Sequence, residues 1–215
     1  MENNKSRKDE FEYIYENNVW GGDETTKNGP GSSKKKTVII KKSLAKIFEL
    51  FPSKKIILSD IGCGDLAWMK QFISQNEDNI KKYIGYDIAT NITEHNKNTI
   101  KSDNIEIINK DCVEYIPKYS DVILCRQVLG HLYTDDVKKL ISNVVKSGSI
   151  YFITSQDFSV KENKELKKNR DKTRARGINL LLSPFNFPEP IMYIDDFIDF
   201  FKLGVWKISD LKNIF

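Results

Sequence analysis

One stretch, residues 56 to 69, constrains the fold of this chain more than any other. It reads Ile-Ile-Leu-Ser-Asp-Ile-Gly-Cys-Gly-Asp-Leu-Ala-Trp-Met. An apolar run of strand length ends near an acidic residue, passes through two glycines and enters a segment whose apolar residues have helical spacing. The stretch therefore predicts a strand, a tight turn and a helix.

The predicted turn has the features of a ligand loop. Gly62 and Gly64 can adopt backbone angles that other residues avoid, and they leave no side chain between the main chain and a ligand. Amide groups at the start of the following helix suit a carboxylate or a phosphate. Asp60, at the carboxyl end of the strand, is placed to accept hydrogen bonds from an ammonium group. A ligand that carries both an amine and a carboxylate would fit.

The glycine loop alone does not choose between cofactors, because it also satisfies the loose Gly-x-Gly-x-x-Gly/Ala dinucleotide fingerprint. A second strand-like run, residues 82 to 87, ends in Asp87, which lies 23 residues after Gly64. This is about where such a fold places the carboxylate that binds ribose hydroxyls. Together the two features indicate a ligand that contains a nucleoside.

Strands and helices alternate through the middle of the chain. Strands are expected at 56–61, 82–87, 105–108, 121–125 and 150–154. Helices are expected at about 40–51, 66–73, 88–100 and 134–146, the last capped by Thr134-Asp135-Asp136 and followed by Gly148. This pattern is typical of a parallel sheet with right-handed crossovers. Two further strands, 191–194 and 203–208, predict an antiparallel pair at the sheet edge. We therefore expect an α/β, Rossmann-like, seven-stranded, mostly parallel sheet with helices on both faces.

The N-terminal part differs in composition from the rest. Residues 5 to 16 suggest a short amphipathic helix, and residues 17 to 33 are rich in glycine and asparagine. This loop contains Trp20, Asp23 and Glu24, so it is either a lid or binding loop or a surface loop held by Trp20. We divide the chain into residues 1–36, with the helix and entry loop, and residues 37–215, the main domain.

Composition limits the classes of function. The 215 residues are 40% hydrophobic and carry a net charge of +4, which supports a globular core but does not by itself indicate nucleic-acid binding. The basic segment 161–176 is either a solvated helix or mobile loop, or a loop that attracts an anionic substrate. The first ten residues lack the apolar core of a signal peptide, and no run of 18 apolar residues occurs. We expect a cytoplasmic protein that does not enter membranes, with its three cysteines reduced and packed as small apolar groups.

Four motifs occur in order along the chain. They are Trp20-Gly21-Gly22-Asp23-Glu24 with Gly29-Pro30-Gly31-Ser32, Cys63-Gly64-Asp65-Leu66-Ala67-Trp68-Met69, Cys125-Arg126-Gln127-Val128-Leu129-Gly130-His131-Leu132, and Asn179-Leu180 with Pro184-Phe185-Asn186-Phe187-Pro188-Glu189-Pro190. With these motifs the chain resembles the class I S-adenosylmethionine-dependent methyltransferases, and within that superfamily it resembles a poorly characterised group that has been linked to sugar methylation. Leu66 stands where the superfamily often has a third glycine.

The resemblance implies roles for individual residues in binding S-adenosylmethionine. The methionine part would be held by Asp60 and the loop Gly62-Cys63-Gly64, the ribose hydroxyls by Asp87 with Ile88 beside it, and the adenine by Asp111 with Cys112. Each acid has a structural alternative, because Asp60 could cap the turn, Asp87 could cap the next helix and Asp111 could form a turn.

Transfer to a hydroxyl acceptor also requires a general base. His131 is the best candidate, because it follows the fourth strand and its unperturbed pKa lies near neutrality. Arg126 either grips the acceptor or anchors the loop by a salt bridge. Weaker candidates for the acceptor site are Trp20, Glu24, Arg176 and Asn186. Neither the histidines nor the acids have the spacing of a metal site.

The sequence therefore favours an S-adenosylmethionine-dependent enzyme that methylates a hydroxyl of a small molecule or saccharide, such as a sugar or nucleotide sugar. Three alternatives remain open at this point. They are an RNA methyltransferase, a non-catalytic regulatory subunit that binds the cofactor, and a nicotinamide-dependent oxidoreductase that uses the same loop.

Overall fold

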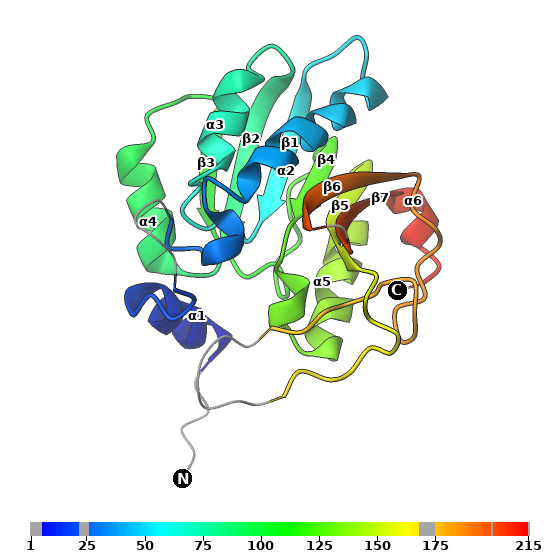
Figure 1. The fold of residues 1–215 in the computed structure, drawn as a ribbon. Coiled ribbons are helices and arrows are strands. Elements are labelled where there is room, and N and C mark those ends of the chain that lie inside the picture. Colours follow the sequence, from blue (N-terminus) through cyan, green and yellow to red (C-terminus); the bar gives the residue numbers. More distant parts are fainter. Residues whose placement is uncertain (1–5, 22–25, 168–174, 199, 215) are drawn as a thin grey trace.

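The structure is a computed structural model that describes residues 6–21, 26–167, 175–198 and 200–214. Its centre is one seven-stranded sheet in the order β3-β2-β1-β4-β5-β7-β6. The strands are β1 (Ile56–Ile61), β2 (Ile80–Asp87), β3 (Ile105–Asn109), β4 (Val122–Cys125), β5 (Tyr151–Asp157), β6 (Met192–Ile198) and β7 (Phe201–Lys207). The first five are parallel, and β7 pairs antiparallel with both β5 and β6. The predicted Rossmann-like sheet with its antiparallel C-terminal pair is confirmed (Figure 1).

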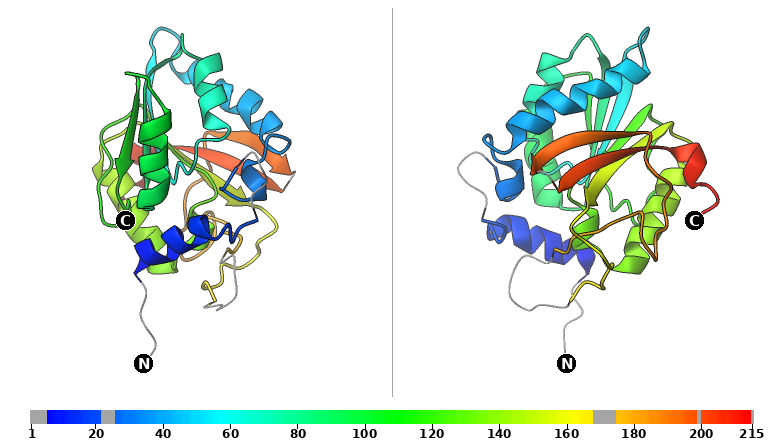
Figure 2. Two further views of the ribbon diagram at one scale, coloured as in Figure 1. Left: turned by 90° about the vertical axis from the view of Figure 1, so that its left-hand side faces the viewer. Right: turned by 45° about the vertical axis from the view of Figure 1, so that its right-hand side comes forward.

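Helices cover both faces of this sheet (Figure 2). The helices are α1 (Arg7–Glu16), α2 (Thr37–Leu44), α3 (Met69–Gln75), α4 (Thr90–Thr99), α5 (Thr134–Lys146) and α6 (Ile208–Leu211), with short 3-10 helices η1 (Pro30–Ser32), η2 (Ala45–Leu50) and η3 (Leu129–His131). One core cluster packs α2 and α3 against the sheet, and a second packs α5 and α6 against the opposite face. Along β4, Val122 and Leu124 belong to the first cluster and Ile123 and Cys125 to the second. A strand covered on both faces needs this apolar run.

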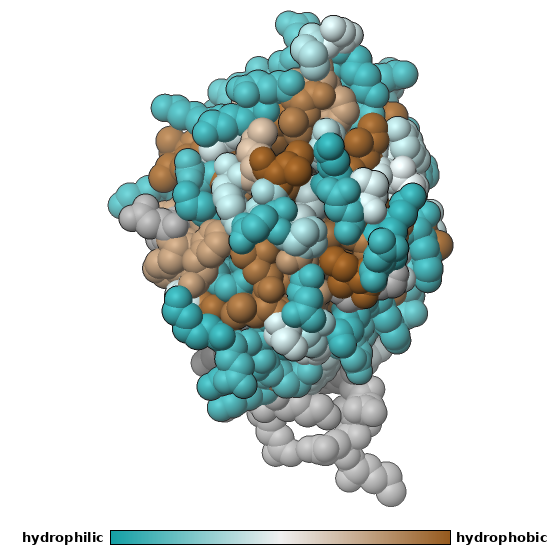
Figure 3. All heavy atoms as spheres, turned by 90° about the vertical axis from the view of Figure 1, so that its right-hand side faces the viewer, coloured by the Kyte–Doolittle hydropathy of each residue, from teal (hydrophilic) through white to brown (hydrophobic). Residues whose placement is uncertain are grey.

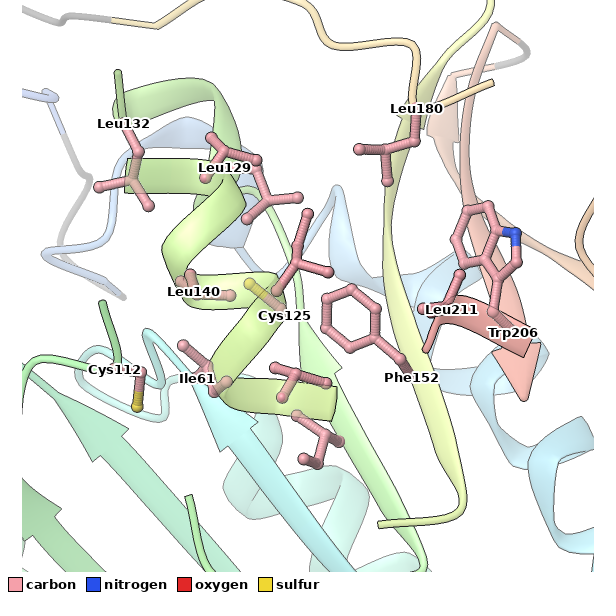
Figure 4. Close-up of a cluster of buried hydrophobic side chains, with 14 of the residues drawn as sticks. Ile61, Cys112, Cys125, Leu129, Leu132, Leu140, Phe152, Leu180, Trp206 and Leu211 are labelled. Carbon is pink, nitrogen blue, oxygen red and sulfur yellow. The ribbon is translucent and has the colours of Figure 1, made fainter. Parts of the chain in front are cut away.

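Figure 4 shows part of the second cluster, in which α5 contributes Leu140 and the sheet contributes Phe152 and Trp206. On the face drawn in Figure 3, apolar residues form several clusters divided by hydrophilic ones. All three cysteines are free and buried, as predicted. Among the described residues, no helix is both long and apolar enough to cross a membrane.

Several predicted boundaries were wrong. The helix expected to continue to Phe51 ends at Leu44 and continues as the tighter η2. Thr134 does not cap α5, since it is the first helical residue and its N–H donates to Glu165 Oε1 at 3.1 Å. A carboxylate from a distant segment therefore replaces the local cap. The sixth strand was expected to end at Ile194, but β6 runs on to Ile198.

Candidate functional site

A cavity of about 310 Å³ lies at the carboxyl edge of the parallel strands. This is the edge at which open α/β sheets bind ligands, and the volume suits a small-molecule site. The ends of β1, β2 and β4, the segment after β3, the entry loop and helix α1 all contribute to its wall. The lining residues are Arg7, Phe11, Tyr15, Trp20, Asn28, Gly29, Pro30, Gly31, Ser32, Ile61, Gly62, Tyr86, Asp87, Ile88, Lys110, Asp111, Cys112, Val113, Arg126, Gln127, Val128, His131, Leu132, Leu140 and Ala175.

The glycine loop has left-handed backbone angles, with φ of +72° at Gly62 and +56° at Gly64. A Cβ at Gly62 would lie 2.3 Å from Val128 Cγ2, and one at Gly64 would lie 2.2 Å from Asn28 Oδ1. Both positions therefore require glycine, because side chains of other loops lie too close to leave room for a Cβ atom. Leu66, which stands in place of the third glycine, keeps a φ of +56° and is fully buried, so the turn retains its shape.

Asp87 is the acid most clearly built to bind a ligand. It is the last residue of β2, it is buried, and it lines the cavity. Its carboxylate accepts the N–H groups of Gly64 and Ala89, each at 3.0 Å. Burial raises the pKa of Asp87 above its ordinary value, and these amide donors oppose the rise. Oδ2 also accepts the Tyr15 hydroxyl at 3.4 Å, so a ligand hydroxyl that bound this carboxylate would share it with Tyr15.

Asp60 is placed differently. It is not among the described residues that line the cavity, and its carboxylate accepts the O–H of Tyr83 at 2.8 Å. Burial raises its pKa to about 7. Cys63 and Gly64 also stand behind the wall, where the Cys63 thiol donates to Gly64 O and the Gly64 carbonyl accepts from Asn96 Nδ2 at 2.7 Å. Of the loop residues predicted to hold the cofactor, the structure brings only Gly62 to the cavity.

The segment after β3 meets the cavity where the adenine was expected. Asp111 and Cys112 line the cavity together with Ile88. One carboxylate oxygen of Asp111 accepts the N–H of Val113 at 2.9 Å, and the other pairs with the Arg7 guanidinium. Asn109 fixes the neighbouring backbone by donating from Nδ2 to Ile88 O at 2.9 Å. The apolar side chains beside an acid suit a flat, partly polar ring.

His131 stands in η3 after β4, inside an aromatic group on the cavity wall. Its ring centroid lies 5.1 Å from that of Trp20 and 6.5 Å from that of Phe11. Trp20 also meets Tyr15 edge to face at 5.3 Å. The structure thus brings the predicted base and the predicted substrate tryptophan into one cluster.

Arg126 is engaged by protein groups. Its Nε and Nη2 donate to both oxygens of Asp196 on β6, at 2.9 and 2.8 Å, and Nη2 also donates to Gly31 O at 3.0 Å. The side chains of Arg126 and Asp196 are 4% and 0% exposed, so the pair is desolvated and its geometry is fixed. Of the two roles expected for Arg126, the contacts favour the anchor of the entry loop.

The entry loop is also attached to the glycine loop. Asp65 accepts the N–H of Lys27 at 2.6 Å and the hydroxyl of Thr26 at 3.3 Å, and its own N–H donates to Asn28 Oδ1 at 3.0 Å. These bonds explain why Asn28 to Ser32 line the cavity. Glu24 and Asp23 lie outside the residues that the structure describes.

Two of the weaker candidates for the acceptor site, Arg176 and Asn186, are not among the described residues that line the cavity. Arg176 Nη2 donates to Leu132 O at 3.0 Å, and its Nη1 lies 3.5 Å from Glu165 Oε1. These contacts hold the segment that brings its neighbour Ala175 to the cavity. Asn186 is exposed in a turn, with φ of +51°.

Several lining residues were not singled out from the sequence. Tyr15 donates to Asp87 Oδ2 at 3.4 Å, and Arg7 pairs with Asp111. Gln127 has a φ of +57°, which is strained for a side chain of this size. The four-residue spacing of Arg7, Phe11 and Tyr15 in α1 is the signal that could have found that helix face. Among the described residues, no group of three His, Cys, Asp or Glu side chains could hold a metal ion.

Comparison with known families gives one match, to a family model described as a methyltransferase domain, over residues 59–153. No curated protein matches the sequence. The matched residues run from β1 to β5, so they include the glycine loop, Asp87, Asp111 and the segment with His131.

Solved structures share the fold at low sequence identity. Magnesium protoporphyrin IX methyltransferase from Synechocystis PCC 6803, with bound S-adenosylmethionine, is 13% identical at a TM-score of 0.61, over 96% of this chain and 98% of that chain. The PH0226 protein from Pyrococcus horikoshii OT3 is 15% identical at 0.58, over 83% and 93%. Human N-acetylserotonin methyltransferase, in complex with S-adenosylmethionine, is 13% identical at 0.57, over 80% and 52%. These likenesses show a common fold.

The family match and the fold agree with the site. The residues that match the methyltransferase domain span the strands whose carboxyl ends form the cavity, and Asp87 lines that cavity. The match to a methyltransferase domain over residues 59–153 and the Rossmann-like methyltransferase fold together support an enzyme that uses S-adenosylmethionine as its cofactor.

Proposed function

We propose that the protein methylates a hydroxyl group of a small molecule, with a sugar or nucleotide sugar as the first choice of acceptor. The observation that carries this proposal is that Asp87 and His131 line the same cavity. One is a buried carboxylate suited to a ribose, and the other is a side chain that can accept a proton near neutral pH. The motif resemblance supports a saccharide as the methyl acceptor. The cytoplasmic location stays a prediction from the sequence.

The residues at the β2 and β3 ends of the cavity fit the nucleoside part of the cofactor. Asp87 would accept the two ribose hydroxyls, while Ile88, Asp111 and Cys112 would surround the adenine. Positive φ at Gly62 brings main chain rather than a side chain to the wall at the end of β1. When bound, S-adenosylmethionine supplies a methyl group activated by its positively charged sulfur.

The residues of this chain then have two tasks, to align the acceptor and to remove its proton. Trp20, Phe11 and Val128 form an apolar wall that excludes water and fixes the acceptor, and such positioning lowers a barrier by several kcal/mol. The hydroxyl proton passes to the His131 imidazole. Arg126 takes no proton in this scheme, and its pair with Asp196 keeps the entry loop over the cavity.

Two measurements test the proposal. Isothermal titration should show binding of S-adenosylmethionine and S-adenosylhomocysteine but not of nicotinamide dinucleotides. An acceptor screen that starts with nucleotide sugars should then find turnover, and His131→Ala should lower it by about 10²- to 10⁴-fold with the cofactor Kd unchanged. His95→Ala changes the other histidine of the chain and is the matched control, because His95 lies on α4 and is not among the residues that line the cavity. Full activity of His131→Ala on the acceptor at every pH would exclude the base assignment.

The remaining alternatives predict other outcomes. A non-catalytic regulatory subunit would bind the adenosyl compounds and methylate no acceptor. An RNA methyltransferase would bind RNA with an affinity that falls steeply with salt. We place RNA second, because Arg176, one of the cations that suggested it, is engaged by Leu132 O and Glu165.

A further inference from the structure

Helix α1 places three cavity-lining side chains at four-residue spacing. Arg7, Phe11 and Tyr15 lie on one face of the helix, and all three line the cavity. Figure 1 shows α1 across the end of the sheet rather than on either of its faces. The helix is attached to the start of α4 by Glu12, whose Oε1 accepts the N–H of Thr90 at 3.0 Å. The helix thus forms a wall of the cavity that the sheet does not supply.

The first side chain of this face joins two separate elements. The Arg7 guanidinium pairs with Asp111 after β3, and its Nη2 lies 2.8 Å from Asp136 Oδ1 in the first turn of α5. The Arg7 and Asp111 side chains are each 23% exposed, and that of Asp136 is 19% exposed, so solvent only partly screens the attraction. A planar guanidinium can reach two carboxylates at once, which a lysine ammonium does less well.

The last side chain of the face reaches the other acid. Tyr15 is buried, and its hydroxyl donates to Asp87 Oδ2 at 3.4 Å. That same oxygen accepts the N–H of Gly64 at 3.0 Å. Between these ends, Phe11 packs against Trp20 at 6.0 Å. One helix face therefore contacts both acids that the proposed function assigns to the nucleoside.

From these contacts we infer that Arg7 and Tyr15 are positioning residues for the cofactor, and that α1 must leave Asp111, Asp136 and Asp87 before the cofactor can be exchanged. This inference rests on the proposed function. Arg7 orients Asp111, Tyr15 orients Asp87, and the docked helix closes the nucleoside end of the cavity. The rate at which S-adenosylhomocysteine leaves is then set by how firmly α1 is held.

The test is the dissociation rate of S-adenosylhomocysteine, followed by stopped-flow tryptophan fluorescence because Trp20 lines the cavity. Arg7→Gln should raise this rate about tenfold, the size of one charge-assisted hydrogen bond. Arg7→Lys should give a smaller increase. Lys97→Gln is the control for the loss of one positive charge, since Lys97 is an exposed residue of α4 whose pair is with Glu94, at 3.0 Å on the same helix. It should leave the rate unchanged.

Salt provides a readout that loss of fold would not imitate. The wild-type dissociation rate should rise between about 50 mM and about 500 mM NaCl, whereas that of Arg7→Gln should barely change, because salt screens the ion pairs. Asp136→Asn removes the carboxylate that pairs with Arg7 in the first turn of α5, and it should raise the dissociation rate as Arg7→Gln does. It takes the place of Arg7→Gln in the test if Arg7→Gln does not fold. Rates within twofold of the wild type in both variants would refute the inference. Failure of the wild type to bind either adenosyl compound would instead refute the proposed function.

Discussion

Two buried acids near the ends of neighbouring strands show how differently similar sequence features can be used. Asp60 in β1 and Asp87 in β2 are each 5% exposed. Asp87 faces the cavity and is held by two backbone amides, whereas Asp60 stands behind the cavity wall and is held by the hydroxyl of Tyr83. Only Asp87 has the surroundings of a ligand-binding group.

The position of each acid within its strand explains the difference. Asp87 is the final residue of β2, so its side chain can turn back to the Ala89 amide of the following segment. Asp60 is followed by one more strand residue, Ile61, and its carboxylate meets the hydroxyl of Tyr83 on the neighbouring β2. The two acids thus differ by one strand residue in their distance from the strand end, and of the two only Asp87 lines the cavity.

Removal of the Asp87 carboxylate should have the largest effect. Asp87→Ala removes the acceptor that we propose for the two ribose hydroxyls, and hydrogen bonds to charged groups contribute about 1.5 to 3 kcal/mol each. We expect no binding of S-adenosylmethionine detectable by isothermal titration. Circular dichroism should still show a folded chain. Near-normal affinity in Asp87→Ala would show that the two acids do not differ in the way described.

The pH dependence of stability should reveal the second acid. Burial raises the pKa of Asp60 from its ordinary value of 3.8 to about 7. The native chain then holds this proton more tightly than the unfolded chain. The stabilising contribution of Asp60 is therefore full below about pH 4 and is lost as the pH rises through about 7, a change of about 4 kcal/mol.

Asp60→Asn removes this titration. The difference in unfolding free energy between Asp60→Asn and the wild type should therefore shift in favour of the variant between about pH 5 and about pH 8. Urea denaturation at both pH values measures it, and all other titrating groups cancel because the two chains share them. A constant difference would mean that Asp60 titrates normally.

Much of the fold could be predicted because its signals are local. The five parallel strands are short apolar runs, and the two glycines mark the turn after β1. A predicted helix end was wrong where a residue distant in the sequence caps the helix. Glu165 caps α5 from 31 residues away, which no local pattern at Thr134 could show.

The site was only partly predictable for the same reason. Asp87 ends a strand, and Asp111 and His131 follow strands, so topology alone brings them to one edge of the sheet. The placement of Asp60 behind the wall and the anchoring of Arg126 depend on Tyr83 and Asp196, which are far from them in sequence. The part played by α1 could not be read from its charges, because it depends on which acids Arg7 meets.

Loss of the hydroxyl that donates to Asp60 should lower the free energy of unfolding by an intermediate amount. Tyr83→Phe leaves the buried carboxylate without the hydroxyl that lies 2.8 Å away, and an unsatisfied buried group costs about 1 to 3 kcal/mol. We expect that loss in the unfolding free energy at about pH 8, where Asp60 is ionised. Tyr119→Phe is the matched control, since Tyr119 is 53% exposed and should change stability by less than about 0.5 kcal/mol. Equal effects of the two variants would remove Tyr83 as the partner that holds Asp60.

The smallest effect should be that of Asp60→Asn on cofactor binding, and it is the most direct test of the contrast with Asp87. The amide that this substitution introduces has nearly the shape of the carboxylate and can still accept the Tyr83 hydroxyl, so the wall in front of it should not move. Isothermal titration with S-adenosylmethionine at about pH 7 should give a Kd within about threefold of the wild type, less than about 0.7 kcal/mol. A loss of about thirtyfold or more in a variant with normal thermal stability would mean that Asp60 does reach the ammonium group of the cofactor. The two acids would then divide one ligand between them, and the strand-end argument would have to be abandoned.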